Sequence, residues 1–97
     1  MLLDPIPPGE ILYDDFMKPK GISINKLARD IAVPVNRISN IVNGKRGITA
    51  DTALRLEIYF GVEAQFWQNL QSEYDLRLMK RKIGSDLKRR IMPLQVA

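Results

Sequence analysis

The 97-residue chain carries 15 Lys and Arg residues against 11 Asp and Glu, a net charge of +4, and contains neither His nor Cys. This length suits one compact domain, and the missing residue types exclude disulfides, thiol chemistry and most metal sites and catalytic triads. Because no apolar run approaches the ~18 residues of a membrane span, we expect a cytoplasmic protein with one globular domain.

The opening segment predicts a helix over about residues 8–17, with Leu12 and Phe16 one turn apart on its buried side. Lys18-Pro19 should end it, since a residue before proline is pushed out of the helical region. Residues 1–17 carry four acidic side chains and no basic one, which suits contact with a basic protein better than contact with DNA. These candidates for a protein contact are Asp4, Glu10, Asp14 and Asp15.

Residues 23–44 predict two short amphipathic helices joined by a tight turn. Ser23 is a good N-cap for the first helix, residues 32–34 form the turn, and Pro34 suits the first position of the second helix. Gly44 ends that second helix. The buried positions recur at helical spacing and are Leu27, Ala28, Ile31, Ile38, Ile41 and Val42.

The other side of the second helix is almost entirely amide, hydroxyl and guanidinium, the groups that read base edges in a DNA major groove. Candidate base readers are Val35, Asn36, Arg37, Ser39 and Asn40, and candidate phosphate contacts are Ser23, Lys26, Asn43, Lys45 and Arg46. Two such helices also occur in all-α proteins that bind no nucleic acid. DNA binding is favoured by the basic loop Gly44–Gly47 and by the charge of residues 18–46, which hold seven basic residues and one acidic residue.

A fourth helix should begin after Thr49 as N-cap, run to about Tyr59 and end at Gly61. Asp51 in its first turn is favourable for the helix dipole. Its apolar residues cover a wide arc, so we expect the central core helix here. They are Ala53, Leu54, Leu56, Ile58 and Phe60.

A fifth helix is predicted over residues 64–80, with an apolar stripe at helical spacing. The stripe consists of Phe66, Trp67, Leu70, Tyr74 and Leu78. We interpret Phe66 and Trp67 first as core residues, and the length of the stripe also suggests a dimer interface. Beyond it, residues 79–97 form a basic extension, either a short helix capped by Ser85 or a disordered tail. The predicted layout is therefore an all-α domain of five helices over residues 1–78, followed by this extension.

The segment SINKLARDIAVPVNRISNIVNGKRGITADTALRL resembles the helix-turn-helix of phage-repressor-like (XRE, lambda-repressor-like) regulators, and among them the HigA/VapI-type antitoxins. PIPPGEIL, GKRGITADTALRLEIYFG and FWQNLQSEYDLRL resemble further blocks of that family in the same order, so Pro5 to Leu78 is covered. Three residues depart from the family pattern: Pro7 replaces a common histidine, Ile24 a phosphate-contacting glutamine, and Ala32 a turn glycine.

The resemblance implies a homodimeric, sequence-specific repressor that binds its own operator and neutralises a small basic HigB-type toxin, an mRNA endonuclease. Two alternatives are a free-standing phage-type repressor without a toxin, and a protein-interaction module that no longer binds DNA. An enzyme is not expected, and neither a cofactor nor a metal is. Asp14 and Asp15 are adjacent and point about 100° apart on a helix, and GKRG lacks the spacing of a phosphate-binding loop.

Overall fold

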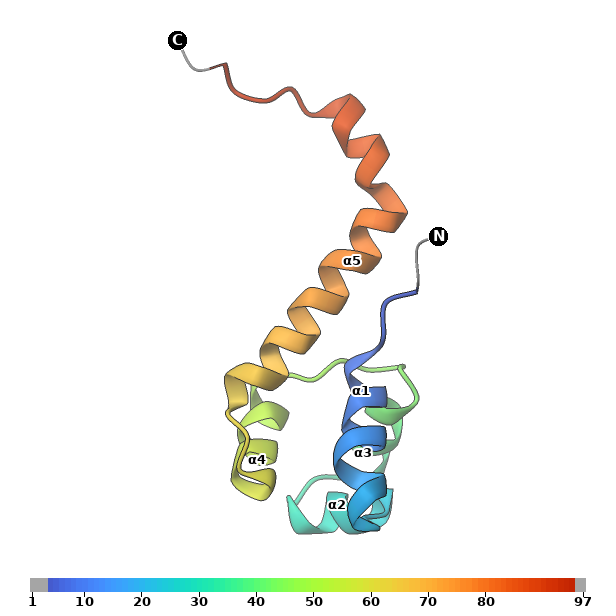
Figure 1. Cartoon of the computed structure of the whole chain (residues 1–97), viewed down its shortest axis with the longest axis vertical. Coiled ribbons are helices and arrows are strands. Elements are labelled where there is room, and N and C mark those ends of the chain that lie inside the picture. The colour runs from blue at the N-terminus through green and yellow to red at the C-terminus, as the bar shows by residue number, and fades with distance from the viewer. Residues whose placement is uncertain (1–3, 96–97) are drawn as a thin grey trace.

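The computed structural model describes residues 4–95, and Figure 1 shows a helical body from which one long helix extends. The first helical segment is continuous and consists of α1 (Pro8–Ile11), the π-helix η1 (Leu12–Met17) and the 3-10 turn η2 (Lys18–Lys20). It is followed by α2 (Ile24–Asp30), α3 (Val35–Val42), α4 (Ala50–Phe60) and α5 (Ala64–Arg90). Residues 4–95 contain no strand, so the predicted five-helix, all-α fold is confirmed.

The first helical segment runs one turn further than predicted. Lys18-Pro19 does not end it, because Pro19 lies at the start of a 3-10 turn, where no helical hydrogen bond is required of its nitrogen. The chain leaves this turn at Gly21, whose φ of 65° is left-handed.

The turn between α2 and α3 takes a conformation that is unfavourable for its residue type. Ser23 caps α2 as predicted, accepting a 3.0 Å hydrogen bond from the Lys26 backbone. Ala32 has a φ of 59°, a left-handed conformation that costs a residue with a Cβ atom about 1–2 kcal/mol. Pro34 is the N-cap of α3 and not its first helical residue as predicted. The turn therefore accepts strain where a glycine would relieve it.

The core lies between the helix-turn-helix, the first helical segment, α4 and the start of α5. Its apolar side chains are Leu12, Met17, Leu27, Ala28, Ile31, Ile38, Ile41, Ile48, Ala53, Leu56 and Trp67. The prediction that α4 is apolar and buried over a wide arc is only partly right. Leu54 and Ile58 are exposed, because the core covers one side of α4 and leaves the other to solvent.

Backbone contact between α1 and the end of α3 depends on Gly9. A Cβ atom built on Gly9 would lie 1.7 Å from the carbonyl oxygen of Ile41. No residue other than glycine therefore fits at this position without a backbone shift. Through this contact the first helical segment supports the C-terminal end of α3.

The predicted end of the fifth helix is wrong. α5 does not stop at Lys80 but continues to Arg90, so Ser85 lies within it and is not an N-cap. Its outer half (residues 76–90) is rich in Lys and Arg, which are good helix formers. Asp86 pairs with Arg89 and Arg90 along it. α5 therefore crosses the expected boundary at residue 78 as one helix. Within residues 4–95, no helix is long and apolar enough to cross a membrane.

For Trp67 the interpretation as a core residue is confirmed, and its alternative role as a dimer-interface candidate is excluded. Its side chain is fully buried, and its ring lies 4.7 Å from that of Phe16 and 5.1 Å from that of Phe66 (centroid distances). Leu70 packs against the same core. Trp67 and Leu70 therefore pack in the core, because the start of α5 covers the open side of the helical body. Among the other candidates, Phe66 and Leu78 are exposed and Tyr74 is half-buried.

Candidate nucleic-acid interface

The outer side of α3 carries polar groups close to the surface. Val35 and Asn36 are exposed at its N-terminal end, and Ser39 and Asn40 are half-buried one turn further on. Ile38 and Ile41 on the opposite side are buried, so the core determines how the helix is rotated. The outer side of α3 therefore presents the Asn36 amide near its N-terminal end and the partly buried Ser39 and Asn40 one turn further on.

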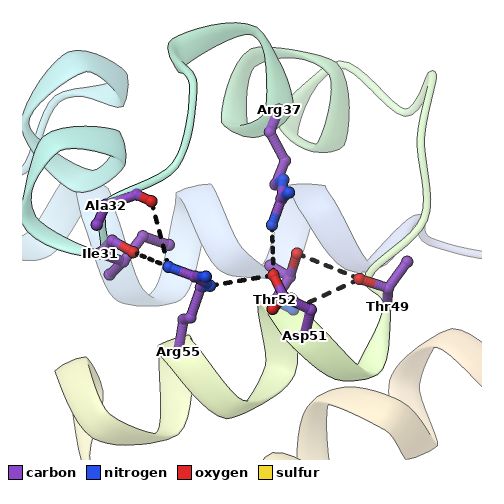
Figure 2. Close-up of polar contacts among 7 residues, drawn as sticks. All are labelled: Ile31, Ala32, Arg37, Thr49, Asp51, Thr52 and Arg55. Atoms are coloured by element: carbon purple, nitrogen blue, oxygen red, sulfur yellow. Dashed lines mark hydrogen bonds and ion pairs between the residues drawn. The ribbon is translucent and has the colours of Figure 1, made fainter.

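Arg37 is a correction to the predicted set of base readers. Figure 2 shows its side chain extending from α3 toward α4, where its Nη1 donates a 2.5 Å hydrogen bond to Oδ2 of Asp51. The side chain is only 24% exposed, and its Nε is buried without a hydrogen-bond partner. Arg37 thus forms an ion pair between α3 and α4 and does not point outward with Asn36.

Asp51 also binds a second arginine. Nε of Arg55 donates to the same Oδ2 over 3.0 Å, and Nη1 of Arg55 donates to the carbonyl oxygens of Ile31 (2.8 Å) and Ala32 (3.2 Å) (Figure 2). The two guanidinium groups, Arg37 first, hold the pKa of the Asp51 carboxyl below its ordinary value. Asp51 is therefore ionised throughout the physiological pH range.

A second cluster of polar side chains connects α2 to α4. Asp30 accepts hydrogen bonds from Nζ of Lys26 (2.8 Å) and from the Tyr59 hydroxyl (2.7 Å). The hydrogen bond from Lys26 is the first cause of a lowered Asp30 pKa, and the carboxylate in turn raises the pKa of Lys26. Lys26, a predicted phosphate contact, stays half-exposed and charged, but in this structure it is paired within its own helix.

The basic loop after α3 is held at both ends. The backbone N–H groups of Lys45 and Arg46 both donate to the carbonyl oxygen of Asn40, over 2.8 and 3.2 Å. At the far end, Ile48 donates its N–H to Gln71 (2.7 Å) and accepts at its carbonyl from Gln68 (2.9 Å). Both basic side chains are exposed. The loop therefore carries two exposed, positively charged side chains on a fixed backbone next to α3.

The remaining phosphate candidates lie close to this loop or at the start of α2. Asn43 is exposed and donates to the Ser39 hydroxyl over 3.4 Å, which brings these two candidates together. Ser23 uses its oxygen as the α2 cap but is exposed.

The acidic candidates for a protein contact all lie at the surface. Asp4 pairs with Arg81 of α5 over 2.6 Å, while Glu10, Asp14 and Asp15 are exposed on the first helical segment. Within residues 4–95, no group of three or more His, Cys, Asp or Glu side chains is placed to hold a metal ion.

Sequence reasoning missed the residues that support this interface from behind. Asp51 was assigned only to the helix dipole, and neither Arg55 nor the two glutamines were singled out. The pairs Arg37–Asp51 and Ile48–Gln71 are 14 and 23 positions apart, so no helical periodicity connects them.

Comparison with known proteins agrees with this geometry. Residues 15–67 match the protein family described as Helix-turn-helix (HTH_3). Virulence-associated protein I of Dichelobacter nodosus is 51% identical over 76 residues, 78% of this chain and 70% of that protein. Antitoxin HigA-1 of Vibrio cholerae is 38% identical over 72 residues, 74% of this chain and 68% of that protein.

A solved structure covers nearly the whole chain. It is described as Pseudomonas aeruginosa antitoxin HigA with the higBA promoter, and it is 46% identical to this chain with a TM-score of 0.91. The match spans 94% of this chain and 99% of that one. The chain belongs to the HigA/VapI-type antitoxins of the helix-turn-helix family.

Proposed function

We propose that the chain is a sequence-specific DNA-binding repressor that serves as the antitoxin of a HigBA-type toxin–antitoxin pair and represses its own operon. The observation that carries this proposal is the outward polar side of α3 beside a basic loop whose backbone is anchored at both ends. The similar HigA structure described with its promoter supports it. No catalytic step is part of this function, and operator binding would take place in the bacterial cytoplasm.

In the proposed complex, α3 enters the major groove from its N-terminal end. Asn36 hydrogen-bonds a base edge through its amide, Val35 packs on a thymine methyl group, and Ser39 and Asn40 contact bases further along the helix. Lys45 and Arg46 neutralise backbone phosphates, which orients the protein on the duplex without reading sequence.

The test compares two substitutions on the promoter fragment upstream of the protein's reading frame and on a scrambled duplex of equal length. Lys45→Ala should weaken binding to both duplexes and lower the slope of log K against log salt by about 1. Asn36→Ala should cost about 1–3 kcal/mol on the promoter and leave the scrambled duplex unaffected. Lys88→Ala, the same change of charge on the outer half of α5, is the matched control.

If Lys45→Ala and Asn36→Ala both bind the promoter as tightly as the unmodified protein, the assignment of α3 as the reading helix is refuted. Salt-independent affinity of the unmodified protein for the promoter, or no affinity, would favour the interaction module without DNA binding.

The proposal includes a homodimer formed through α5. Since Trp67 is buried, we place the interface on the exposed residues of the outer half, where Leu76, Met79, Ile83 and Leu87 recur every three or four positions. Two copies paired there would present their α3 helices to successive major grooves, ~34–36 Å apart. Ile83→Lys should give a monomer by light scattering and lower promoter affinity. A dimer that persists in this variant would contradict the placement.

The toxin partner is proposed from the family and from the acidic first segment, which complements a small basic protein. Purification of the tagged chain from its native cells should recover such a protein in stoichiometric amount. Charge reversal at Glu10 and Asp14 should slow its association. Recovery of promoter DNA with no protein partner would instead identify a free-standing repressor.

A further inference from the structure

A carboxylate of α4 pairs with an arginine of α3 and with a second arginine that itself reaches the turn after α2. Oδ2 of Asp51 accepts from Arg37 of α3 and from Arg55, and Arg55 reaches the carbonyl oxygens of Ile31 and Ala32 in the turn after α2 (Figure 2). We propose that Asp51 is a positioning residue for DNA reading, which restrains Arg37 away from the groove and fixes the orientation of α3 relative to the turn. This inference rests on the proposed function.

The turn needs such support because its own backbone is strained. Ala32 is held at a positive φ, and its carbonyl oxygen and that of Ile31 receive hydrogen bonds from Arg55. A neutral side chain at position 51 would no longer neutralise and orient Arg55. The turn would then lose part of the restraint that keeps α2 and α3 at one angle.

The position of Arg37 is the second reason to assign Asp51 a role in DNA reading. Its Cα lies between those of Asn36 and Ile38 on α3, one position from the proposed base reader, yet its guanidinium is turned toward α4 by Asp51. Arginine is long and always charged, and it binds phosphates strongly. Without the carboxylate, it is free to reach the DNA backbone and to bind any sequence.

The ion pairs of Asp51 make only a modest contribution to stability. Its side chain is 56% exposed, and exposed ion pairs contribute little to folding. A residue that acts only on stability would also change operator and scrambled DNA binding together. Positioning predicts opposite changes on the two duplexes.

The experiment uses the full chain with Asp51→Asn, which keeps the shape and removes the charge, and measures affinity for the promoter fragment and for the scrambled duplex over a range of salt. We expect the ratio of promoter to scrambled affinity to fall about tenfold. The salt slope on scrambled DNA should become steeper by about 1, since one more cation meets a phosphate. In Asp51→Asn combined with Arg37→Gln, this slope should return to that of the unmodified protein.

Glu73→Gln is the matched control, because Glu73 also pairs with an arginine, Arg77, but lies on α5 away from the helix-turn-helix and outside the proposed dimer stripe. It should change neither the affinity ratio nor the slope by the amounts above. Equal changes in Glu73→Gln and Asp51→Asn would show that the effect comes from net charge alone, and would overturn the proposal. An unchanged ratio in Asp51→Asn would overturn it as well.

Arg37→Gln alone keeps the proposal testable if Asp51→Asn folds poorly. Because Arg37 is restrained away from DNA, this variant should leave the salt slope unchanged, and a slope lower by about 1 would refute the inference. Failure of the proposed function is distinguishable, since the unmodified protein would then show no preference for its promoter.

Discussion

The contact between Gly9 and α3 yields a prediction in which one substitution has opposite effects at two positions. Gly9→Ala would place a methyl group 1.7 Å from the Ile41 carbonyl oxygen, which would have to move by about 1.7 Å to reach the 3.4 Å where ordinary contacts begin. The obstructing atom is backbone, so no side-chain rotation relieves the clash. We therefore expect the upper end of the range for overpacking, a loss of about 3 kcal/mol of unfolding free energy.

Gly84→Ala provides the matched control on the exposed outer half of α5. The nearest atom to its added methyl group is the Lys80 Cβ at 3.9 Å, an ordinary contact. Here alanine replaces glycine inside a helix without a clash, which should stabilise that helix by up to about 1 kcal/mol.

Thermal unfolding followed by circular dichroism measures both changes. For a domain of this size, a loss of about 3 kcal/mol lowers Tm by roughly 12–24 °C, whereas Gly84→Ala should hold or raise Tm. Gly9→Ala should also weaken promoter binding at temperatures where it is folded, since Ile41 lies at the end of α3 beside the basic loop. A Tm for Gly9→Ala within about 3 °C of the unmodified protein would refute the argument from the close approach.

Three further predictions concern the strained turn, the core and pH. Ala32→Gly should raise the unfolding free energy by about 1 kcal/mol, because glycine adopts the positive φ without strain; a lower value in urea titration would contradict this. Trp67→Ala should lower the unfolding free energy by about 3–5 kcal/mol, because it leaves a cavity in the core. Dimerisation of this variant, measured by light scattering below its Tm, should be unaffected. The Asp51 pKa is lower in the folded chain than in the unfolded one, so its stabilisation is present above its ordinary pKa near 4 and is lost as pH falls through the folded value. Urea titrations from pH 5 downward should therefore show a steeper loss of stability in the unmodified protein than in Asp51→Asn, and equal slopes would contradict the ion pairs.

Local features of this protein are determined by the sequence alone. Ser23 and Thr49 cap α2 and α4, and Gly44 and Gly61 take positive φ after α3 and α4, because capping and left-handed backbone depend on residues a few positions apart. Helical spacing of apolar residues likewise identified the buried sides of α2 and α3, and the ordered family blocks identified the family.

Only the tertiary structure decided which elements those sides meet. The stripe on α5 predicts an apolar side but not whether the core or a second copy covers it, and burial of Trp67 follows from the open side of the helical body that α5 closes. Arg37 has the same position on α3 whether it reads DNA or pairs with Asp51. Its direction depends on a carboxylate 14 positions away, brought near by the packing of α4. Helical periodicity describes one helix at a time, and the placement of charges between helices is a property of the assembled fold.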